Sequence, residues 1–207
     1  MLFTKVPSVV RWLSPSAIFW KIPVKEKIVF LTFDDGPIPE ATPEVLEILE
    51  QKNVNATFFC VGDNVKKYPQ IFALVKEKGH DIGNHTFNHI KGFRTPDENY
   101  FTNIAMCDEQ VQSKYFRPPY GQIRPRQIKY LSKSYSIIMW TAFSGDFDPS
   151  LSVKRCIKNI ITAARPGAIF VFHDSLKARE KMLPALSEVI DILKEKGYSF
   201  GLLSDFI

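Results

Sequence analysis

The sequence predicts an α/β fold: a single domain built on a sheet of parallel strands. Short apolar runs alternate with helix-like segments, and no linker-like or low-complexity stretch divides the chain. This alternation is typical of parallel sheets, because each crossover between parallel strands needs a connecting segment, usually a helix. The strand-like runs are Ile28–Phe33, Ala56–Val61, His80–Asn84, Lys114–Phe116, Tyr135–Trp140, Ala168–Phe172 and Tyr198–Leu202.

Capping signals delimit the segments between these runs. Thr42, followed by Pro43-Glu44, is a predicted N-cap with proline at N1 and an acidic first turn, and Thr95 repeats the pattern. Ser152 is predicted to cap a later helix. Gly79 and Gly197 follow Lys/Glu-rich segments and are predicted to end helices at C′. The helices therefore fall where the crossovers require them.

Composition narrows the class of protein. The 207 residues, 45% of them hydrophobic, are enough for one compact domain with a sizeable core. The formal charge of +5 is spread along the chain without a block of like charges. This favours an ordinary solvated surface, with an anionic polymer or a membrane surface as the alternative. No nucleic-acid motif and no basic stripe with aromatics is visible, so a nucleic-acid partner is not expected.

Cysteines and the amino terminus bear on compartment. Cys60, Cys107 and Cys156 are odd in number, widely spaced and set in apolar or helix-like stretches, which predicts buried free thiols. Residues 1–20 lack an apolar run followed by a small-residue cleavage site, and no stretch approaches a membrane span. A cytoplasmic location without stable membrane insertion is therefore expected.

Two adjacent carboxylates and a pair of histidines are typical of a metal site. Asp34 and Asp35 end the first apolar run, and His85 and His89 follow fifty residues later. Imidazoles four residues apart share one face of a helix, and they also converge from a turn. With one of the carboxylates they give a divalent metal three protein ligands and leave a position open for water. The second carboxylate is then a candidate general base.

Other polar residues follow the ends of other predicted strands. In parallel barrels and open sheets the active site is built at that edge, from residues that follow several strands. The sequence therefore predicts one site, assembled from Asp34 and Asp35, His85, Arg117, Asp146 and His173.

Five motifs in this order resemble those of the polysaccharide deacetylase family, the NodB-homology domain of carbohydrate esterase family 4. The likeness covers the chain from about Lys27 to its end, and it implies a distorted (β/α)7 barrel over residues 27–207 with residues 1–26 as an extension packing on it. The motifs are Thr32-Phe33-Asp34-Asp35-Gly36, His85-Thr86-x-x-His89, Arg117-Pro118-Pro119-Tyr120-Gly121, Trp140 with Asp146-Phe147, and Ile169-x-Val171-x-His173.

The resemblance implies a division of labour. Asp35, His85 and His89 would bind a divalent metal; zinc suits these ligands best, and cobalt, nickel, manganese or iron fit similar sites. Asp34 would accept a proton from the attacking water, with Arg117 paired to it and holding it ionised.

The leaving group needs a proton donor. The resemblance implies that His173 protonates the departing amine and that Asp146 orients it, although a turn-forming aspartate is the alternative reading of Ser144-Gly145-Asp146. It also implies an oxyanion donor in the backbone N–H of Tyr120.

Substrate-binding positions follow from the same motifs. The expected residues are Tyr120, Pro119, Trp140, Phe147 and Val171, with Phe147 and Val171 lining a small apolar pocket for an acetyl methyl or, alternatively, belonging to the core. Several positions depart from the family pattern without removing a catalytic atom, which leaves the choice of glycan open. They are Thr141, Phe143, Phe147, Ile169 and Val171.

The leading hypothesis is a metal-dependent hydrolase that removes N-acetyl groups from sugars of a peptidoglycan- or chitin-like glycan. One alternative is hydrolysis of non-glycan amides, including cyclic ones, on the same fold. A second is a glycan-binding module that has lost turnover, against which the presence of both Asp34 and His173 argues. A non-haem iron oxygenase also uses two histidines and a carboxylate, but has no use for this acid/base pair.

Overall fold

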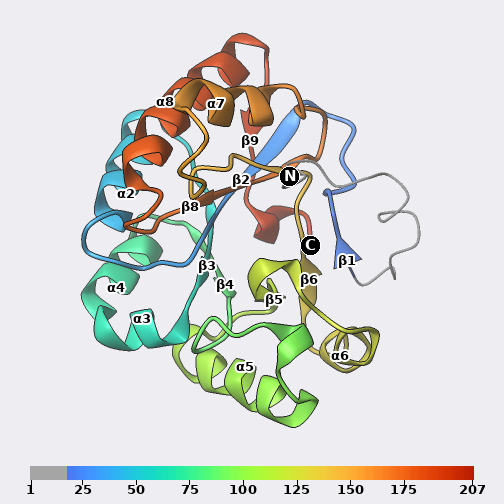
Figure 1. Cartoon of the computed structure of the whole chain (residues 1–207). Coiled ribbons are helices and arrows are strands. Elements are labelled where there is room, and N and C mark those ends of the chain that lie inside the picture. Colours follow the sequence, from blue (N-terminus) through green and yellow to red (C-terminus); the bar gives the residue numbers. More distant parts are fainter. Residues whose placement is uncertain (1–17) are drawn as a thin grey trace.

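The computed structural model describes residues 18–207. Its strands run parallel and form a curled sheet in the order β1-β6-β5-β4-β3-β2-β8-β7, with β9 beside the start of β2 (Figure 1). The strands are β1 (Ile18–Phe19), β2 (Ile28–Asp34), β3 (Thr57–Cys60), β4 (Asp81–Asn84), β5 (Tyr115–Phe116), β6 (Ser136–Ile138), β7 (Ala142–Phe143), β8 (Ile169–His173) and β9 (Ser199–Phe200).

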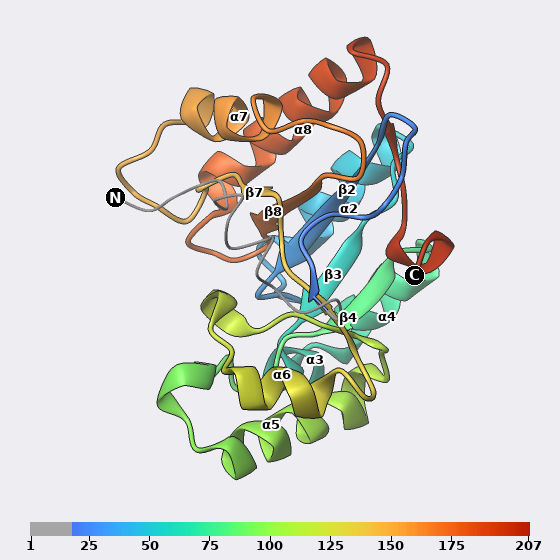
Figure 2. The same cartoon turned by 90° about the vertical axis from the view of Figure 1, so that its right-hand side faces the viewer.

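Helices form an outer layer around this sheet (Figures 1 and 2). They are α2 (Thr42–Gln51), α3 (Gly62–Lys67), α4 (Pro69–Glu77), α5 (Asp97–Val111), α6 (Pro125–Leu131), α7 (Val153–Ile161) and α8 (Arg179–Glu195), with short 3-10 helices η1 (Gly92–Arg94), η2 (Pro119–Gly121) and η3 (Leu203–Asp205). The arrangement is the distorted barrel expected from the sequence.

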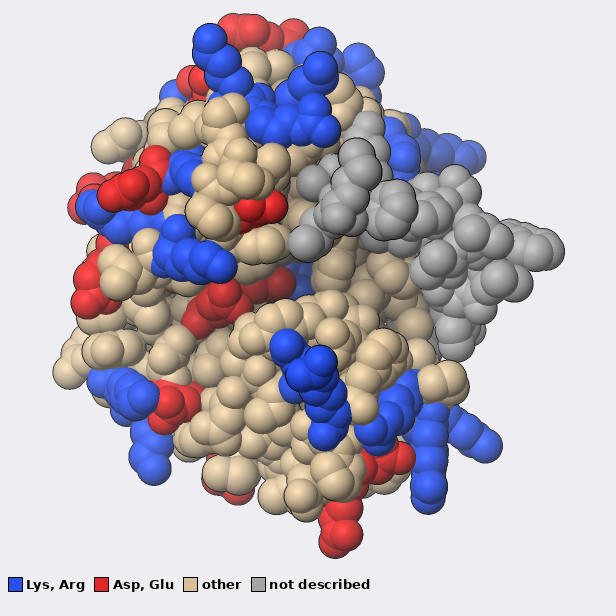
Figure 3. Space-filling model, viewed as in Figure 1, with Lys and Arg blue, Asp and Glu red and all other residues tan. Residues whose placement is uncertain are grey.

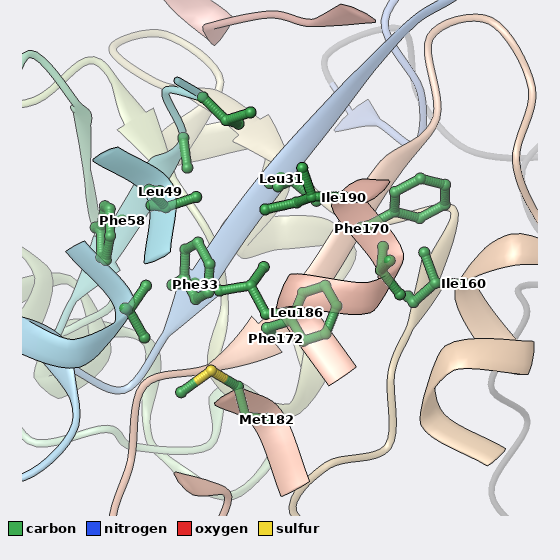
Figure 4. Close-up of a cluster of buried hydrophobic side chains, with 14 of the residues drawn as sticks. Leu31, Phe33, Leu49, Phe58, Ile160, Phe170, Phe172, Met182, Leu186 and Ile190 are labelled. Carbon is green, nitrogen blue, oxygen red and sulfur yellow. The ribbon is translucent and has the colours of Figure 1, made fainter. Parts of the chain in front are cut away.

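Alternation along the two central strands separates core from site. Leu31 and Phe33 of β2, like Phe170 and Phe172 of β8, pack outward against the helices (Figure 4). Because successive side chains of a strand point to opposite faces, the residues between them point into the barrel. Near the start of β2 the interior of the barrel is filled by a second apolar cluster, which includes Phe30. Nearer the carboxyl ends of β2 and β8 the inward-facing residues are polar, so the alternation along these two strands determines where the site lies.

All seven predicted strands are confirmed, and two further ones were not expected. β1 and β7 contain two residues each, too few for a run to stand out in the sequence. β1 pairs with β6, and Lys21 makes a bridge to Ala168 just before β8. The chain just before β2 therefore lies against the barrel strands. The other residues of the predicted extension, 1–17, lie outside the described part of the chain.

Helix starts were predicted less well than strands. Thr42 is not an N-cap: α2 begins at Thr42 itself, and its hydroxyl donates to Asp174. Thr95 is not a cap either: Pro96 is the residue before α5, and the Thr95 hydroxyl donates to the carbonyl of Lys91. Neither hydroxyl accepts from the first turn of its helix. Ser152 caps α7 as predicted, accepting from the Arg155 N–H.

The remaining structural predictions concern thiols and membranes. All three cysteines are buried and free, as predicted, and lie in β3, α5 and α7. Within residues 18–207, no helix is long and apolar enough to cross a membrane.

Candidate active site

The first carboxylate lies at the end of β2 and points into the barrel. Asp34 is 5% exposed, and its Oδ1 accepts from Nη1 of Arg117 at 2.6 Å. Arg117 follows β5, three strands away across the sheet. This contact matches the pairing expected from the sequence, and it fixes the carboxylate against the barrel wall.

Arg117 is completely buried, and hydrogen bonds and an aromatic contact surround its guanidinium. Its Nε and Nη2 donate to the carbonyls of Ile138 and Met139, Nη1 also donates to Thr32, and the guanidinium lies 4.0 Å from the Phe59 ring centroid. Burial lowers the pKa of the guanidinium, whereas Asp34 raises it. A buried charge with its donors satisfied in this way is fixed in position.

Asp35 turns away from its neighbour because its backbone is left-handed, with φ of 85°. Asn64 donates to its carbonyl at 2.7 Å. The next residue, Gly36, donates to the buried carboxylate of Asp174 at 3.1 Å, and a Cβ on Gly36 would lie 1.9 Å from that carboxylate. Glycine is therefore required there, and Asp174 clamps the loop that carries Asp35. Burial raises the pKa of Asp174 to about 8.

The two histidines converge from a turn, the second of the two geometries considered for their spacing. His85 directly follows β4, and both Thr86 and His89 have positive φ. Nδ1 of buried His85 lies 2.8 Å from the Arg117 carbonyl, which can only accept, so this nitrogen carries the hydrogen. Nε2 is left with its lone pair free. Burial lowers the pKa of His85 to about 4, which keeps the ring neutral.

These three residues form a group suited to a metal ion. The ligand atoms of Asp35, His85 and His89 all lie within 4.8 Å of one another. Oδ1 of Asp35 is 3.2 Å from Nε2 of His89 and 3.9 Å from Nε2 of His85. Burial opposes the charge on Asp35, but the hydrogen bond from His89 and the nearby histidines outweigh it and hold the pKa of the carboxyl below its usual range. One carboxylate and two imidazoles are a donor set that fits zinc and related divalent ions.

A second histidine–carboxylate pair faces the same space. His173 ends β8 beside Asp34, and its Nδ1 donates to Oδ1 of Asp146 at 2.8 Å. The fully buried carboxylate also accepts from the backbone N–H groups of His173 and Phe147. Burial disfavours the imidazolium, but Asp146, helped by Asp35 and Asp34, outweighs burial, and the pKa of His173 rises to about 9. Nε2 then carries a proton at neutral pH.

One cavity of about 620 Å³ joins these groups. It contains Asp34, Asp35, His85, His89 and His173, and Figure 3 shows the corresponding hollow, with acidic surface at its centre. Its apolar wall consists of Trp140, Phe143, Phe147 and Val171, and Tyr120, Ser175 and Lys177 complete the lining.

Tyr120 is 57% exposed, and its ring centroid lies 4.7 Å from that of His89. The backbone is left-handed, with φ of 59°, and among the described residues no acceptor takes the Tyr120 N–H. Pro119 is buried and does not line the cavity. Arg117 and Asp146 also lie behind the lining, each in contact with a residue that faces the cavity.

Several residues of the site were given no role in the sequence analysis, although Thr32 stands in the first motif. Thr32 links Arg117 to the Phe170 carbonyl, and Asp174 holds Gly36. Ser175 and Lys177 reach the cavity from the loop between β8 and α8. Thr32 could have been found from the alternation of β2, since it shares the inward face with Asp34.

The protein is thus a parallel barrel whose strands carry, at their carboxyl ends, paired acid–base groups and three potential metal ligands. This arrangement is typical of a hydrolytic enzyme. A family model described as polysaccharide deacetylase matches residues 21–136. The chain belongs to this family. It is therefore a hydrolase of carbon–nitrogen bonds in amides other than peptides.

Two named relatives agree with this family membership. The chain is 32% identical over 197 residues to a peptidoglycan-N-acetylglucosamine deacetylase of Bacillus cereus, with 92% of each covered. It is 30% identical to a chitooligosaccharide deacetylase of Azorhizobium caulinodans, covering 86% of this chain and 94% of the relative.

Solved structures extend the comparison. The Bc1960 peptidoglycan N-acetylglucosamine deacetylase, in complex with 4-naphthalen-1-yl-N-oxidanyl-benzamide, matches with a TM-score of 0.88 at 32% identity and 92% coverage of both chains. BA3943 of Bacillus anthracis, a pseudoenzyme of carbohydrate esterase family 4, matches with a TM-score of 0.80 at 25% identity, and the match covers 95% of this chain and 70% of that one. The fold is thus shared by proteins with and without turnover.

Proposed function

We propose that this chain is a divalent-metal-dependent deacetylase that removes the acetyl group from N-acetylated sugars of a peptidoglycan- or chitin-like glycan. The observation that carries the proposal is the grouping of Asp35, His85 and His89 beside Asp34 and His173 on one cavity. The names of the relatives support the glycan, since they include deacetylases of peptidoglycan and of chitooligosaccharides.

Asp35, His85 and His89 would hold the metal, with zinc the ion that best suits their donors and cobalt, nickel, manganese or iron as alternatives. When bound, the ion supplies a Lewis acid that activates water and polarises the amide carbonyl. His85 is prepared for this role, because its Nδ1–H is fixed on the Arg117 carbonyl and its neutral Nε2 faces Asp35.

Asp34 and His173 share the proton transfers. Asp34 accepts a proton from the attacking water, held by Arg117 in the orientation that this requires. His173 donates the Nε2 proton to the departing amine nitrogen, and Asp146 keeps the ring both protonated and oriented.

The remaining lining orients the substrate. The Tyr120 N–H donates to the carbonyl oxygen as negative charge develops on it. Trp140, Phe147 and Val171 form an apolar wall that accepts the acetyl methyl and excludes water from one side of the reacting carbon.

The test combines metal binding with acetate release. Protein freed of metal and reconstituted with zinc or cobalt is assayed on chitin oligomers, peptidoglycan fragments and simple acetamides. We expect activity that requires one ion per chain and that favours the glycans. Release of acetate from acetamides alone would favour the non-glycan alternative, and tight glycan binding without release would favour a binding module.

Histidine variants provide a matched control. His89→Ala is expected to abolish stoichiometric metal binding with little effect on thermal stability, since His89 is only partly buried. His80→Gln alters a histidine that packs against Phe58 outside the cavity, and is expected to keep the metal. Metal content measured on both folded variants contradicts the proposal if His89→Ala still binds one ion tightly.

A further inference from the structure

Two lysines lie beside aromatic rings of the active-site cavity. Lys91 belongs to the segment between β4 and α5, and Lys177 to the loop between β8 and α8. α5 and α8 lie on opposite sides of the sheet in Figure 2, and Figure 3 shows basic surface above and below the acidic hollow. Positive charge therefore borders the hollow on two sides.

Aromatic rings of the lining place both ammonium groups. Nζ of Lys91 lies 4.4 Å from the centroid of Tyr120, and Nζ of Lys177 lies 6.0 Å from that of Phe147. Both rings line the cavity, and so does Lys177. A cation over an aromatic face keeps its capacity to bind an anion, because the ring uses none of the three N–H donors in a strong hydrogen bond.

The carboxylates within the cavity do not need these lysines. Asp34 is paired with Arg117 at 2.6 Å, Asp146 with His173 at 2.8 Å, and Asp35 lies 3.2 Å from His89. Within residues 18–207, neither lysine forms an ion pair; Asp148 is near enough to Lys177 for its pKa to be influenced by that charge, but its carboxylate accepts from Ser150. Two cations beside the lining are thus without an ion pair among the described residues.

We propose that Lys91 and Lys177 bind negatively charged groups, carboxylate or phosphate, on the glycan that enters this cavity. The inference rests on the proposed deacetylase function and specifies its substrate class: an anionic glycan is preferred to a neutral one. Lys91 lies over Tyr120, whose ring packs against His89. Lys177 lies over Phe147, whose ring packs against His173, so a glycan that spans the cavity from His89 to His173 meets both lysines. The strength of these contacts falls as salt is added, because both ammonium groups are close to solvent.

The test uses the metal-loaded protein with Lys91→Met and Lys177→Met, which keep an apolar stem over each ring but remove the charge. Lys114→Met is the matched control, because Lys114 also lies over a tyrosine, 5.3 Å from the centroid of Tyr115, but just before β5, at the opposite ends of the strands from the site. Substrates are neutral chitin oligomers, glycan fragments with carboxylates, and fragments with phosphate substituents.

The expected result is a selective rise in KM. Each lysine variant should raise KM for the anionic glycans about fivefold more than for chitin oligomers, with kcat changing little, which is the scale of an exposed charge pair. Lysine-to-arginine variants should restore the preference, and added salt should reduce it in the unmodified protein. A larger effect on one anionic class identifies carboxylate or phosphate as the group bound.

Equal losses on neutral and anionic glycans, or a Lys114→Met effect of the same size, would overturn the inference. If no substrate releases acetate, the proposed function fails, but the role of the two lysines can still be tested by calorimetric binding of the same fragments. Tighter binding of anionic fragments that depends on Lys91 and Lys177 supports the inference, and the absence of such a preference refutes it.

Discussion

Replacing Asp146 by asparagine is expected to move the alkaline limb of the pH–rate profile. In the folded protein Asp146 is the main group that raises the pKa of His173 to about 9 against the effect of burial, with Asp35 and Asp34 contributing less. Asparagine keeps the shape of the side chain but removes the charge, so burial is then opposed only by Asp35 and Asp34, and the pKa falls toward the ordinary value of about 6.5. The change is therefore about two pKa units.

The magnitude follows from the protonated fraction of His173. At pH 7.5 a pKa of about 9 leaves roughly 97% of the imidazole protonated, whereas a pKa near 6.5 leaves about 10%. A reaction that needs the imidazolium as acid should slow about tenfold at this pH and recover below pH 6. Two pKa units correspond to about 3 kcal/mol, as befits a pair that is almost wholly buried.

The assay is kcat/KM for acetate release from pH 5 to 10, with Asp148→Asn as control. Asp148 lies two residues further on, but its carboxylate accepts from Ser150 and does not contact His173. The limb should move only in Asp146→Asn. A loss of folded protein that is the same at every pH lowers the rate without moving the limb. An unchanged limb in Asp146→Asn refutes the assignment of His173 as the acid.

Three further outcomes are expected. Asp34→Asn and His173→Ala should each lower turnover roughly 10²-fold or more with metal still bound. The double variant should lower turnover by far less than the product of the two single effects, and full activity in either single variant contradicts their roles. Asp174→Ala, which frees the Gly36 N–H, should weaken metal affinity about tenfold, whereas an unaltered Kd would show that the clamp is dispensable. Burial lowers the pKa of His80 to about 4, so below pH 6.5 this histidine takes up a proton when the protein unfolds. Its contribution to the free energy of unfolding is therefore complete above pH 6.5 and is lost as the pH falls toward 4. Between pH 7 and pH 4.5, the free energy of unfolding measured with urea should fall by up to about 3 kcal/mol less in His80→Gln than in the unmodified protein.

The sequence predicted those parts of the molecule that depend on local pattern. The apolar runs Ile28–Phe33 and Ala168–Phe172 identified the two central strands, and the position of Asp34 and His173 just past them placed both at one edge. The structure brings these residues together with His85, because parallel strands carry their carboxyl ends to the same side.

What the sequence could not supply was set by distant partners. Thr42 has every local feature of an N-cap, but its hydroxyl donates to Asp174, which is 132 residues away. The carboxylate of Asp174 in turn matters to the site only through the close approach of Gly36. Lys177 reaches the cavity because of the direction in which a loop leaves β8, and spacing alone does not encode that direction.

The backbone around the cavity is organised differently from the barrel that supports it. Asp35, Thr86, His89 and Tyr120 all have positive φ without being glycine, a conformation that costs of order 1 kcal/mol or more at each position. Three of them line the cavity. The local hydrogen bonds that hold them include those of Asn64 to the Asp35 carbonyl and of the Thr86 N–H to Asn84. Strain of this kind persists only where the surroundings over-determine it, and here the close-packed strands beneath the site provide that support. The unfavourable backbone and the candidate ligands coincide, which is the pattern expected when side-chain placement for binding, rather than stability, has determined the shape of the loops.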